Sequence, residues 1–161
     1  MIRGLVFGEN GQLAKCLAQE QARVADIELI FIGRRICDLE CPSGIAAAID
    51  KIRPDLVINA AAYTGVDLAE SDHDRAIAVN ETAVRVISET TAKQAIPVIH
   101  FSTDYVFDGN ATEPYIETDR IAPLSVYGQT KFAGEQAVRD LNPKHLIFRT
   151  SWLYSPFGKN F

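Results

Sequence analysis

Tyr127 and Lys131 are four residues apart, and this spacing suits proton transfer. On a helix it places both side chains on one face, with Cβ atoms about 5–6 Å apart. The pKa of a phenol is normally about 10, and a nearby ammonium favours the phenolate and lowers that pKa. The pair therefore predicts a tyrosine that exchanges a proton with a substrate near neutral pH. An ordinary solvated helix can carry the same pair, so the other motifs must decide between these alternatives.

Two hydroxyl side chains precede this pair at the predicted end of a strand. The apolar run 96–101 is followed by Ser102 and Thr103. Open α/β sheets bind their ligands outside the carboxyl ends of the strands. We therefore expect these hydroxyls to donate hydrogen bonds in a ligand site.

A glycine turn links the first predicted strand, 2–7, to a predicted helix over 12–25. Its pattern is GxxGxxA, in which Gly8 permits a tight turn, Gly11 lets the backbone approach a pyrophosphate and Ala14 allows close packing of the helix on the strand. The phosphates would lie at the positive end of the helix. An ordinary strand–helix turn with two glycines is the alternative. The predicted cofactor contacts here are Gly8, Asn10, Gly11, Gln12 and Leu13.

The second apolar run, 28–32, is followed by two arginines, Arg34 and Arg35. A carboxylate at this place would bind the 2′-hydroxyl of NAD, whereas an arginine accommodates the 2′-phosphate of NADP. The arginines therefore favour NADPH, although a surface turn also carries solvated arginines. Asp38 and Leu39 are expected to flank the adenine.

Three alanines follow the third predicted strand, 55–58. Small side chains at a strand end leave room for a phosphate or a ribose against the backbone, or else they serve tight packing. The predicted cofactor contacts here are Ala60, Ala61, Ala62 and Tyr63. Asn80 lies on the apolar stripe of a helical segment, where a buried amide needs hydrogen-bond partners and could support the neighbouring site.

Strands and helices alternate along the chain, without an internal repeat. This alternation predicts one α/β domain over 1–161, a doubly wound parallel sheet of the Rossmann type with helices on both faces. The polar segment 108–123 is a long loop of the kind often used for function. The remaining predicted helices are 43–52, 67–94 with a break near Ser71 and Asp72, and 127–141, and the remaining strands are 97–101 and 146–150.

The composition is that of a soluble globular protein. Of 161 residues, 47% are apolar and 23% charged, and the net charge is −5. This balance gives no basic face for nucleic acid, and the apolar runs are far shorter than the ~18 residues that span a bilayer. Met1 leads directly into a strand rather than a secretion signal, so we expect a cytoplasmic protein. Idle thiols and structural histidines are expected at Cys16, Cys37, Cys41, His73, His100 and His145.

Five stretches together resemble the dTDP-4-dehydrorhamnose reductase family of extended short-chain dehydrogenase/reductases. They cover almost the whole chain in the family's order, and FSTDYVFDG is specific to this branch. The stretches are GENGQLA at 8–14, NAAAYTGVDLAE at 59–70, FSTDYVFDG at 101–109, YGQTKFAGE at 127–135 and RTSWLY at 149–154.

The resemblance implies roles for the residues named above. Tyr127 is expected to be the catalytic acid, and Lys131 to lower its pKa and bind the nicotinamide ribose. Thr103 would hydrogen-bond the C4 keto oxygen of dTDP-4-dehydro-L-rhamnose, which NADPH, or NADH, reduces to dTDP-L-rhamnose for cell-surface polysaccharide. The implied substrate contacts are Thr103, Asp104, Tyr105 and Trp152.

The resemblance also implies that the chain corresponds to the N-terminal portion of these reductases. Family members continue into a C-terminal substrate-binding region that supplies much of the sugar-nucleotide site. The family's magnesium cannot be assigned to residues of this chain, and a homodimer is possible. Two alternatives share the motifs: an NADP-binding regulatory subunit like that of methionine adenosyltransferase, and a reductase or epimerase of another nucleotide 4-keto sugar.

Overall fold

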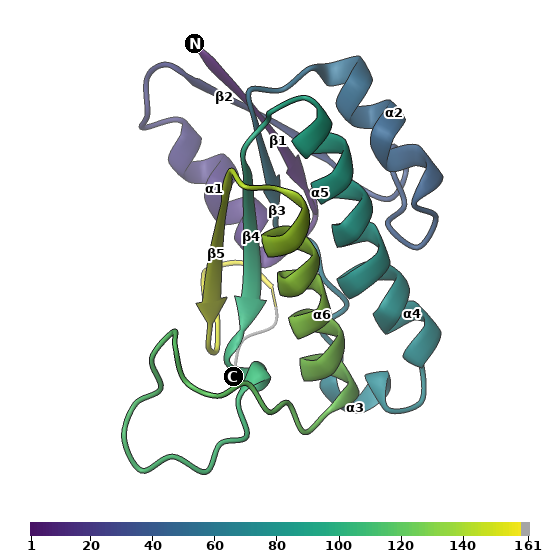
Figure 1. Cartoon of the computed structure of the whole chain (residues 1–161). Coiled ribbons are helices and arrows are strands. Elements are labelled where there is room, and N and C mark those ends of the chain that lie inside the picture. Colours follow the sequence, from purple (N-terminus) through teal and green to yellow (C-terminus); the bar gives the residue numbers. More distant parts are fainter. Residues whose placement is uncertain (159–161) are drawn as a thin grey trace.

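The structure is a computed structural model that describes residues 1–158 and contains a parallel sheet between layers of helices (Figure 1). The strands are β1 (Ile2–Phe7), β2 (Ile27–Ile32), β3 (Leu56–Asn59), β4 (Val98–Thr103) and β5 (His145–Thr150). The α-helices are α1 (Gln12–Gln21), α2 (Ser43–Ile52), α3 (Val66–Ala69), α4 (His73–Ile77), α5 (Ala83–Lys93) and α6 (Val126–Leu141). A π-helical turn, η1 (Ala78–Thr82), joins α4 to α5, and a 3-10 turn, η2 (Asp104–Val106), follows β4.

The strand order is β2-β1-β3-β4-β5, and every neighbouring pair is parallel. In this doubly wound order the winding direction reverses between β1 and β3, where such sheets bind their ligands. Phe7 pairs with Ile32 in β2 and with Asn59 in β3, so the segments that follow these three strands meet at one edge of the sheet. The predicted doubly wound parallel fold is confirmed.

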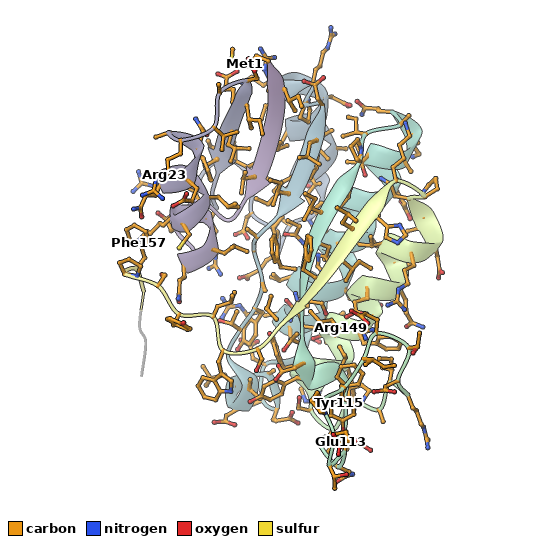
Figure 2. All side chains as sticks on the ribbon, turned by 90° about the vertical axis from the view of Figure 1, so that its left-hand side faces the viewer. Met1, Arg23, Glu113, Tyr115, Arg149 and Phe157 are labelled. Carbon is orange, nitrogen blue, oxygen red and sulfur yellow. The ribbon has the colours of Figure 1, made fainter. Side chains whose placement is uncertain are left out.

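Helix α1 lies on one face of the sheet, and α2, α5 and α6 lie on the other (Figure 1). The long loop between η2 and α6 extends beyond the carboxyl ends of the strands. Figure 2 shows Glu113 and Tyr115 of this loop at the opposite end of the molecule from Met1. The loop therefore borders the edge where the strand ends meet.

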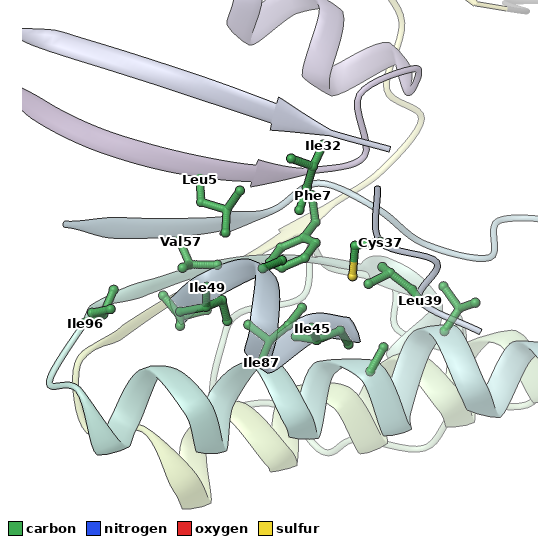
Figure 3. Packing of buried hydrophobic residues seen from close by; sticks show 14 residues of the cluster. Leu5, Phe7, Ile32, Cys37, Leu39, Ile45, Ile49, Val57, Ile87 and Ile96 are labelled. Carbon is green, nitrogen blue, oxygen red and sulfur yellow. The ribbon is translucent and has the colours of Figure 1, made fainter. Parts of the chain in front are cut away.

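The larger hydrophobic core lies between the sheet and helices α2 and α5. Its strands have almost continuous apolar runs because both of their faces are covered, as is typical of parallel sheets. On the α1 face, Val6, Ala14 and Ile58 form a second buried cluster. Figure 3 shows the larger cluster, in which the sheet residues Leu5, Phe7 and Val57 pack against the helix residues Ile45, Ile49 and Ile87.

The element boundaries differ from the predicted ones in two instructive places. Helix α1 ends at Gln21 rather than at residue 25. Val24, which has the spacing of an apolar helix position, lies beyond the helix and is half exposed. The segment 67–94 breaks after α3, as predicted, but it also contains the unpredicted π-helical turn around Asn80.

Within residues 1–158, no helix is long and apolar enough to cross a membrane.

Candidate active site

A cleft of about 1030 Å³ opens at the carboxyl ends of the strands. Its volume is at the upper end of the range of about 300–1,000 Å³ that is usual for small-molecule sites. It brings together almost all the residues that the sequence predicts for the site. Those that line it are Gly8, Asn10, Gly11, Gln12, Leu13, Arg34, Asp38, Leu39, Ala60, Ala61, Ala62, Thr103, Asp104, Tyr105, Tyr127, Lys131 and Trp152.

The turn between β1 and α1 has the form that a phosphate site needs. Gly8 has φ +112°, and a Cβ on it would lie 3.0 Å from backbone atoms of Ala60 and Ala61, so a larger residue would strain the turn. The Gly11 N–H donates to the Gly8 carbonyl at 2.9 Å. Gly11 caps α1 and has no side chain, so the cap residue itself does not occupy the N–H groups of the helix's first turn. These groups and the helix dipole favour an anion here.

Tyr63 is the predicted cofactor contact that does not line the cleft. Its hydroxyl donates to Asp72 at 3.2 Å, and its backbone exchanges two hydrogen bonds with the Asn80 side chain, at 2.9 and 3.1 Å. The Asn80 amide also donates to Thr130 on α6 at 3.2 Å. The Tyr63 hydroxyl is thus directed to Asp72, while its neighbours Ala62 and Thr64 line the cleft, and a contact between Tyr63 and the cofactor stays a prediction. The buried Asn80 has the partners we expected and links the β3–α3 segment to α6.

Helix α6 places Tyr127 and Lys131 on the wall of the cleft. Its N-cap is Ser125, whose hydroxyl accepts from the Gly128 N–H at 3.1 Å. A Cβ on Gly128 would overlap the carbonyl oxygen of Tyr105, so this glycine lets α6 pack closely on η2. The Tyr105 and Tyr127 rings meet edge to face, with centroids 5.6 Å apart. This packing sets the position of the Tyr127 phenol relative to the end of β4.

Lys131 is almost completely buried, with 2% of its surface exposed. Its ammonium donates to the Phe101 carbonyl at 2.6 Å. Burial lowers the pKa of Lys131 from 10.5 to about 8, and the carboxylate of Glu135 opposes that shift. The side chain is thus fixed in place, and its burial makes the charged form less favourable than it is in water.

The pKa of Tyr127 is raised above its ordinary value of 10.0, mainly by burial. The Thr103 side chain lowers it and the Asp104 carboxylate raises it. Lys131 is not among the groups that shift this pKa, because its ammonium is directed to the Phe101 carbonyl, so the expected lowering by Lys131 is not seen in this arrangement. A phenol with a raised pKa keeps its proton at neutral pH, which suits a proton donor.

Thr103 is the last residue of β4, and its hydroxyl is hydrogen-bonded locally. It donates to Asp104 at 3.1 Å and accepts from the Tyr105 N–H at 3.2 Å. The adjacent Ser102 hydroxyl is buried and has no hydrogen-bond partner among the described residues. Both hydroxyls line the cleft, so the predicted placement of donors at a strand end is present.

His100 is a buried neighbour of the site that the sequence analysis treated only as structural. Asn59 donates from Nδ2 to His100 Nδ1 at 3.2 Å, and its Oδ1 accepts from Ala61, which fixes the amide orientation. Burial, with a contribution from Lys131, holds the pKa of His100 well below 6.5. A neutral histidine with its proton on Nε2 follows from this geometry.

Glu135 and Arg149 form a buried ion pair that sequence spacing did not indicate. The Glu135 carboxylate is fully buried and accepts from Arg149 Nε at 2.9 Å and Nη2 at 2.8 Å. The Arg149 guanidinium lies over the Phe107 ring, 5.0 Å from its centroid, and Phe107 stacks on Tyr115. The pair thereby fastens the long loop to the helix that carries Tyr127. The sequence feature that could have suggested a buried carboxylate was Glu135, which lies one helical turn after Lys131 on the same predicted helix.

The lowered pKa of Lys131 predicts a pH-dependent contribution to stability. The folded protein loses this proton near pH 8 and the unfolded chain near 10.5, so the unfolded state binds more protons between these values. The unfolding free energy of the wild type should therefore rise relative to Lys131→Met between pH 8 and 10.5, by on the order of 3 kcal/mol. Denaturant unfolding of both proteins across this range measures the difference. Parallel pH profiles would show that Lys131 titrates normally.

The domain has the features of the short-chain dehydrogenase/reductase class. These are the doubly wound sheet, the glycine turn after β1 and the Tyr-Lys pair on the wall of the cleft. Sequence comparison then narrows the class. The family described as RmlD substrate binding domain matches residues 2–161, and the chain belongs to that family.

Several named proteins are similar to this chain. The dTDP-4-dehydrorhamnose reductase of Sinorhizobium fredii is 49% identical, covering 99% of this chain and 53% of that protein. The Salmonella typhimurium protein of the same name is 45% identical, covering 98% and 53%. The chain therefore spans about half the length of the curated relatives it matches.

Solved structures agree with these relatives. A dTDP-4-dehydrorhamnose reductase from Clostridium acetobutylicum superposes with a TM-score of 0.94 at 37% identity, covering 99% of this chain and 56% of that one. The Bacillus anthracis reductase, solved in complex with NADP, gives a TM-score of 0.91 at 36% identity, with the same coverage.

Proposed function

We propose that this protein reduces the C4 keto group of dTDP-4-dehydro-L-rhamnose to dTDP-L-rhamnose with NADPH. The observation that carries the proposal is that Thr103, Tyr127 and Lys131 line one cleft together with the glycine turn at the N-terminus of α1. The names of the relatives and the NADP bound to the Bacillus anthracis structure support it.

The residues of the cleft fit a dinucleotide. The Gly8 turn and the first N–H groups of α1 would hold the pyrophosphate, because a Cβ at Gly8 would disturb the turn and the helix end is positive. Arg34 and Arg35 would bind the 2′-phosphate, and Asp38 and Leu39 would border the adenine. The segment Ala60–Ala62 would let the cofactor lie against the backbone, and Lys131 would bind the nicotinamide ribose. When bound, NADPH supplies the hydride for the carbonyl carbon.

Tyr127 would donate its phenolic proton to the C4 oxygen as the carbonyl is reduced. Its raised pKa keeps that proton in place until negative charge develops on the oxygen. The Thr103 hydroxyl would hydrogen-bond the same oxygen and orient the carbonyl. Asp104, Tyr105 and Trp152 line the same end of the cleft and are the proposed contacts for the sugar nucleotide.

Residues 1–161 are, in this proposal, a cofactor-binding domain. Because the chain spans about half the length of its curated relatives, much of the sugar-nucleotide site would come from a substrate-binding region in the other half of that length. The free cysteines, Cys16, Cys37 and Cys41, support a reducing compartment such as the cytoplasm.

A spectrophotometric assay of NADPH oxidation tests the proposed function. It uses a polypeptide that carries this sequence at the length of the curated relatives, with dTDP-4-dehydro-L-rhamnose as substrate. The assay should also include dTDP-4,6-dihydroxy-2-methyloxan-3-one as a second substrate. A Streptomyces antibioticus relative that is 39% identical is named a probable 4-ketoreductase of this compound. Failure with every dTDP-4-keto sugar, together with co-purification with a methionine adenosyltransferase, would instead favour a regulatory subunit.

The two arginines after β2 predict a preference for NADPH over NADH. Both line the cleft, and Arg35 makes no ion pair among residues 1–158. A charge-assisted hydrogen bond to phosphate is worth roughly 1.5–3 kcal/mol, so a preference of about tenfold or more is expected. Dissociation constants for both cofactors, measured with Arg34→Ala and Arg35→Ala, test this. Equal preference in the wild type and both variants would show that neither arginine binds the phosphate.

A further inference from the structure

We infer that Glu40 tunes the preference for NADPH by competing with the 2′-phosphate for Arg34, and that Arg75 limits this competition. The inference rests on the proposed use of NADP(H). It makes Glu40 a specificity-determining residue and Arg75 its positioning partner.

Glu40 binds two arginines through one oxygen. Arg34 Nη2 lies 3.4 Å from Glu40 Oε1, and Arg75 Nη2 lies 2.9 Å from the same atom. The two guanidinium groups therefore share one carboxylate oxygen. Since Arg34 lines the cleft and is 69% exposed, its guanidinium is free to exchange between Glu40 and a ligand phosphate.

Arg75 is held in place from several sides. Its Nη1 donates to Asp72 at 3.2 Å, and its guanidinium lies 5.7 Å from the centroid of the Tyr63 ring. The Tyr63 hydroxyl donates to the same Asp72 oxygen. Arg75 is therefore a fixed positive charge that keeps the Glu40 carboxylate directed away from the cleft.

The position of Glu40 is also set from its own side. Its backbone N–H donates to Asp38 Oδ1 at 3.0 Å, and its carboxylate is about one-quarter exposed. The cleft beside Arg34 is also lined by the cation Arg35 and by the carboxylates of Glu9 and Asp38, and Arg75 lies behind Glu40. A 2′-phosphate, with a charge of about −1.5 to −2, would be attracted by the arginines and repelled by the carboxylates.

This arrangement predicts opposite effects for two substitutions. Glu40→Gln removes the competing charge, frees Arg34 and should raise the NADPH preference. Arg75→Gln leaves Glu40 with Arg34 as its remaining arginine partner and should lower the preference. Each shift should be about 1.4-fold to fivefold, since exposed ion pairs are worth about 0.2–1 kcal/mol.

Calorimetric titration of the protein with NADPH and with NADH tests the inference. The measured quantity is the ratio of the two dissociation constants, because a general loss of structure would weaken both cofactors. The matched control is Glu20→Gln, which breaks the exposed ion pair between Glu20 in the last turn of α1 and Arg23 just beyond the helix, and should leave the ratio unchanged. In an Arg34→Ala background, the effect of Glu40→Gln should shrink, since the shared partner is absent.

The outcomes separate this inference from the proposed function. If the wild type binds neither cofactor, the proposed function fails and the inference fails with it. If the wild type binds both cofactors but Glu40→Gln and Arg75→Gln leave the ratio unchanged, or shift it in the same direction, only the inference is overturned. Opposite shifts, with the Glu40→Gln effect reduced in the Arg34→Ala background, support it.

Discussion

Replacing Tyr127 with phenylalanine is expected to lower turnover by about 10²–10⁴-fold, the usual contribution of general acid catalysis. Affinity for NADPH should change little, because the ring and its edge-to-face contact with Tyr105 remain. The hydroxyl that is lost belongs to a buried phenol whose raised pKa keeps its proton in place at neutral pH. Steady-state turnover and the dissociation constant of NADPH, measured on a polypeptide of the relatives' length, check both parts.

Tyr154→Phe is the matched control for this substitution. Tyr154 is 78% exposed and does not line the cleft, so losing its hydroxyl should leave turnover unchanged. If Tyr127→Phe reduced the substrate at nearly the parental rate, another group would have to be the proton donor. The exposed phenol of Tyr105, beside Tyr127, would then be the next residue to replace.

Replacing Glu135 with alanine is expected to lower the unfolding free energy by about 3–5 kcal/mol, as when one partner of a buried ion pair is removed. The carboxylate is fully buried, and it accepts two hydrogen bonds from Arg149 and a third from the more exposed Arg139. Without it, Arg149 loses its main counter-charge while 14% of its side chain is exposed to water. The long loop that packs on Arg149 through Phe107 should loosen as well.

Denaturant unfolding measures this effect, with Glu20→Ala as the control. Glu20 in the last turn of α1 pairs with Arg23 just beyond the helix, and because both side chains are exposed the ion pair contributes at most about 1 kcal/mol. The prediction is therefore a large difference between two substitutions of the same type. Similar small losses in both variants would show that the buried Glu135 carboxylate and its arginine partners contribute little to stability.

Local spacing was sufficient to predict the main features of this chain. The apolar runs predicted the parallel sheet because the central strands β1 and β3 are buried on both faces, and the glycine turn marked the start of α1. The four-residue spacing of Tyr127 and Lys131 placed both on one wall because their helix was long and well capped. Each of these features depends on residues close together in the sequence.

Features that depend on tertiary packing could not be predicted. The raised pKa of Tyr127 comes from burial, and the direction of the Lys131 ammonium depends on a carbonyl of β4. Tyr63 binds Asp72 rather than lining the cleft, because α4 brings that carboxylate beside it. Glu40 and Arg75 are 35 residues apart, and no periodicity connects them.

The most direct test of the account follows the hydride itself. A polypeptide of the relatives' length would be incubated with dTDP-4-dehydro-L-rhamnose and NADPH that carries deuterium at both C4 positions of the nicotinamide. Mass spectrometry and NMR of the sugar would then locate the label. The account predicts one deuterium bound to C4 of dTDP-L-rhamnose for each NADPH oxidised. Product without deuterium at C4, or no product from a protein that binds NADPH, would contradict it.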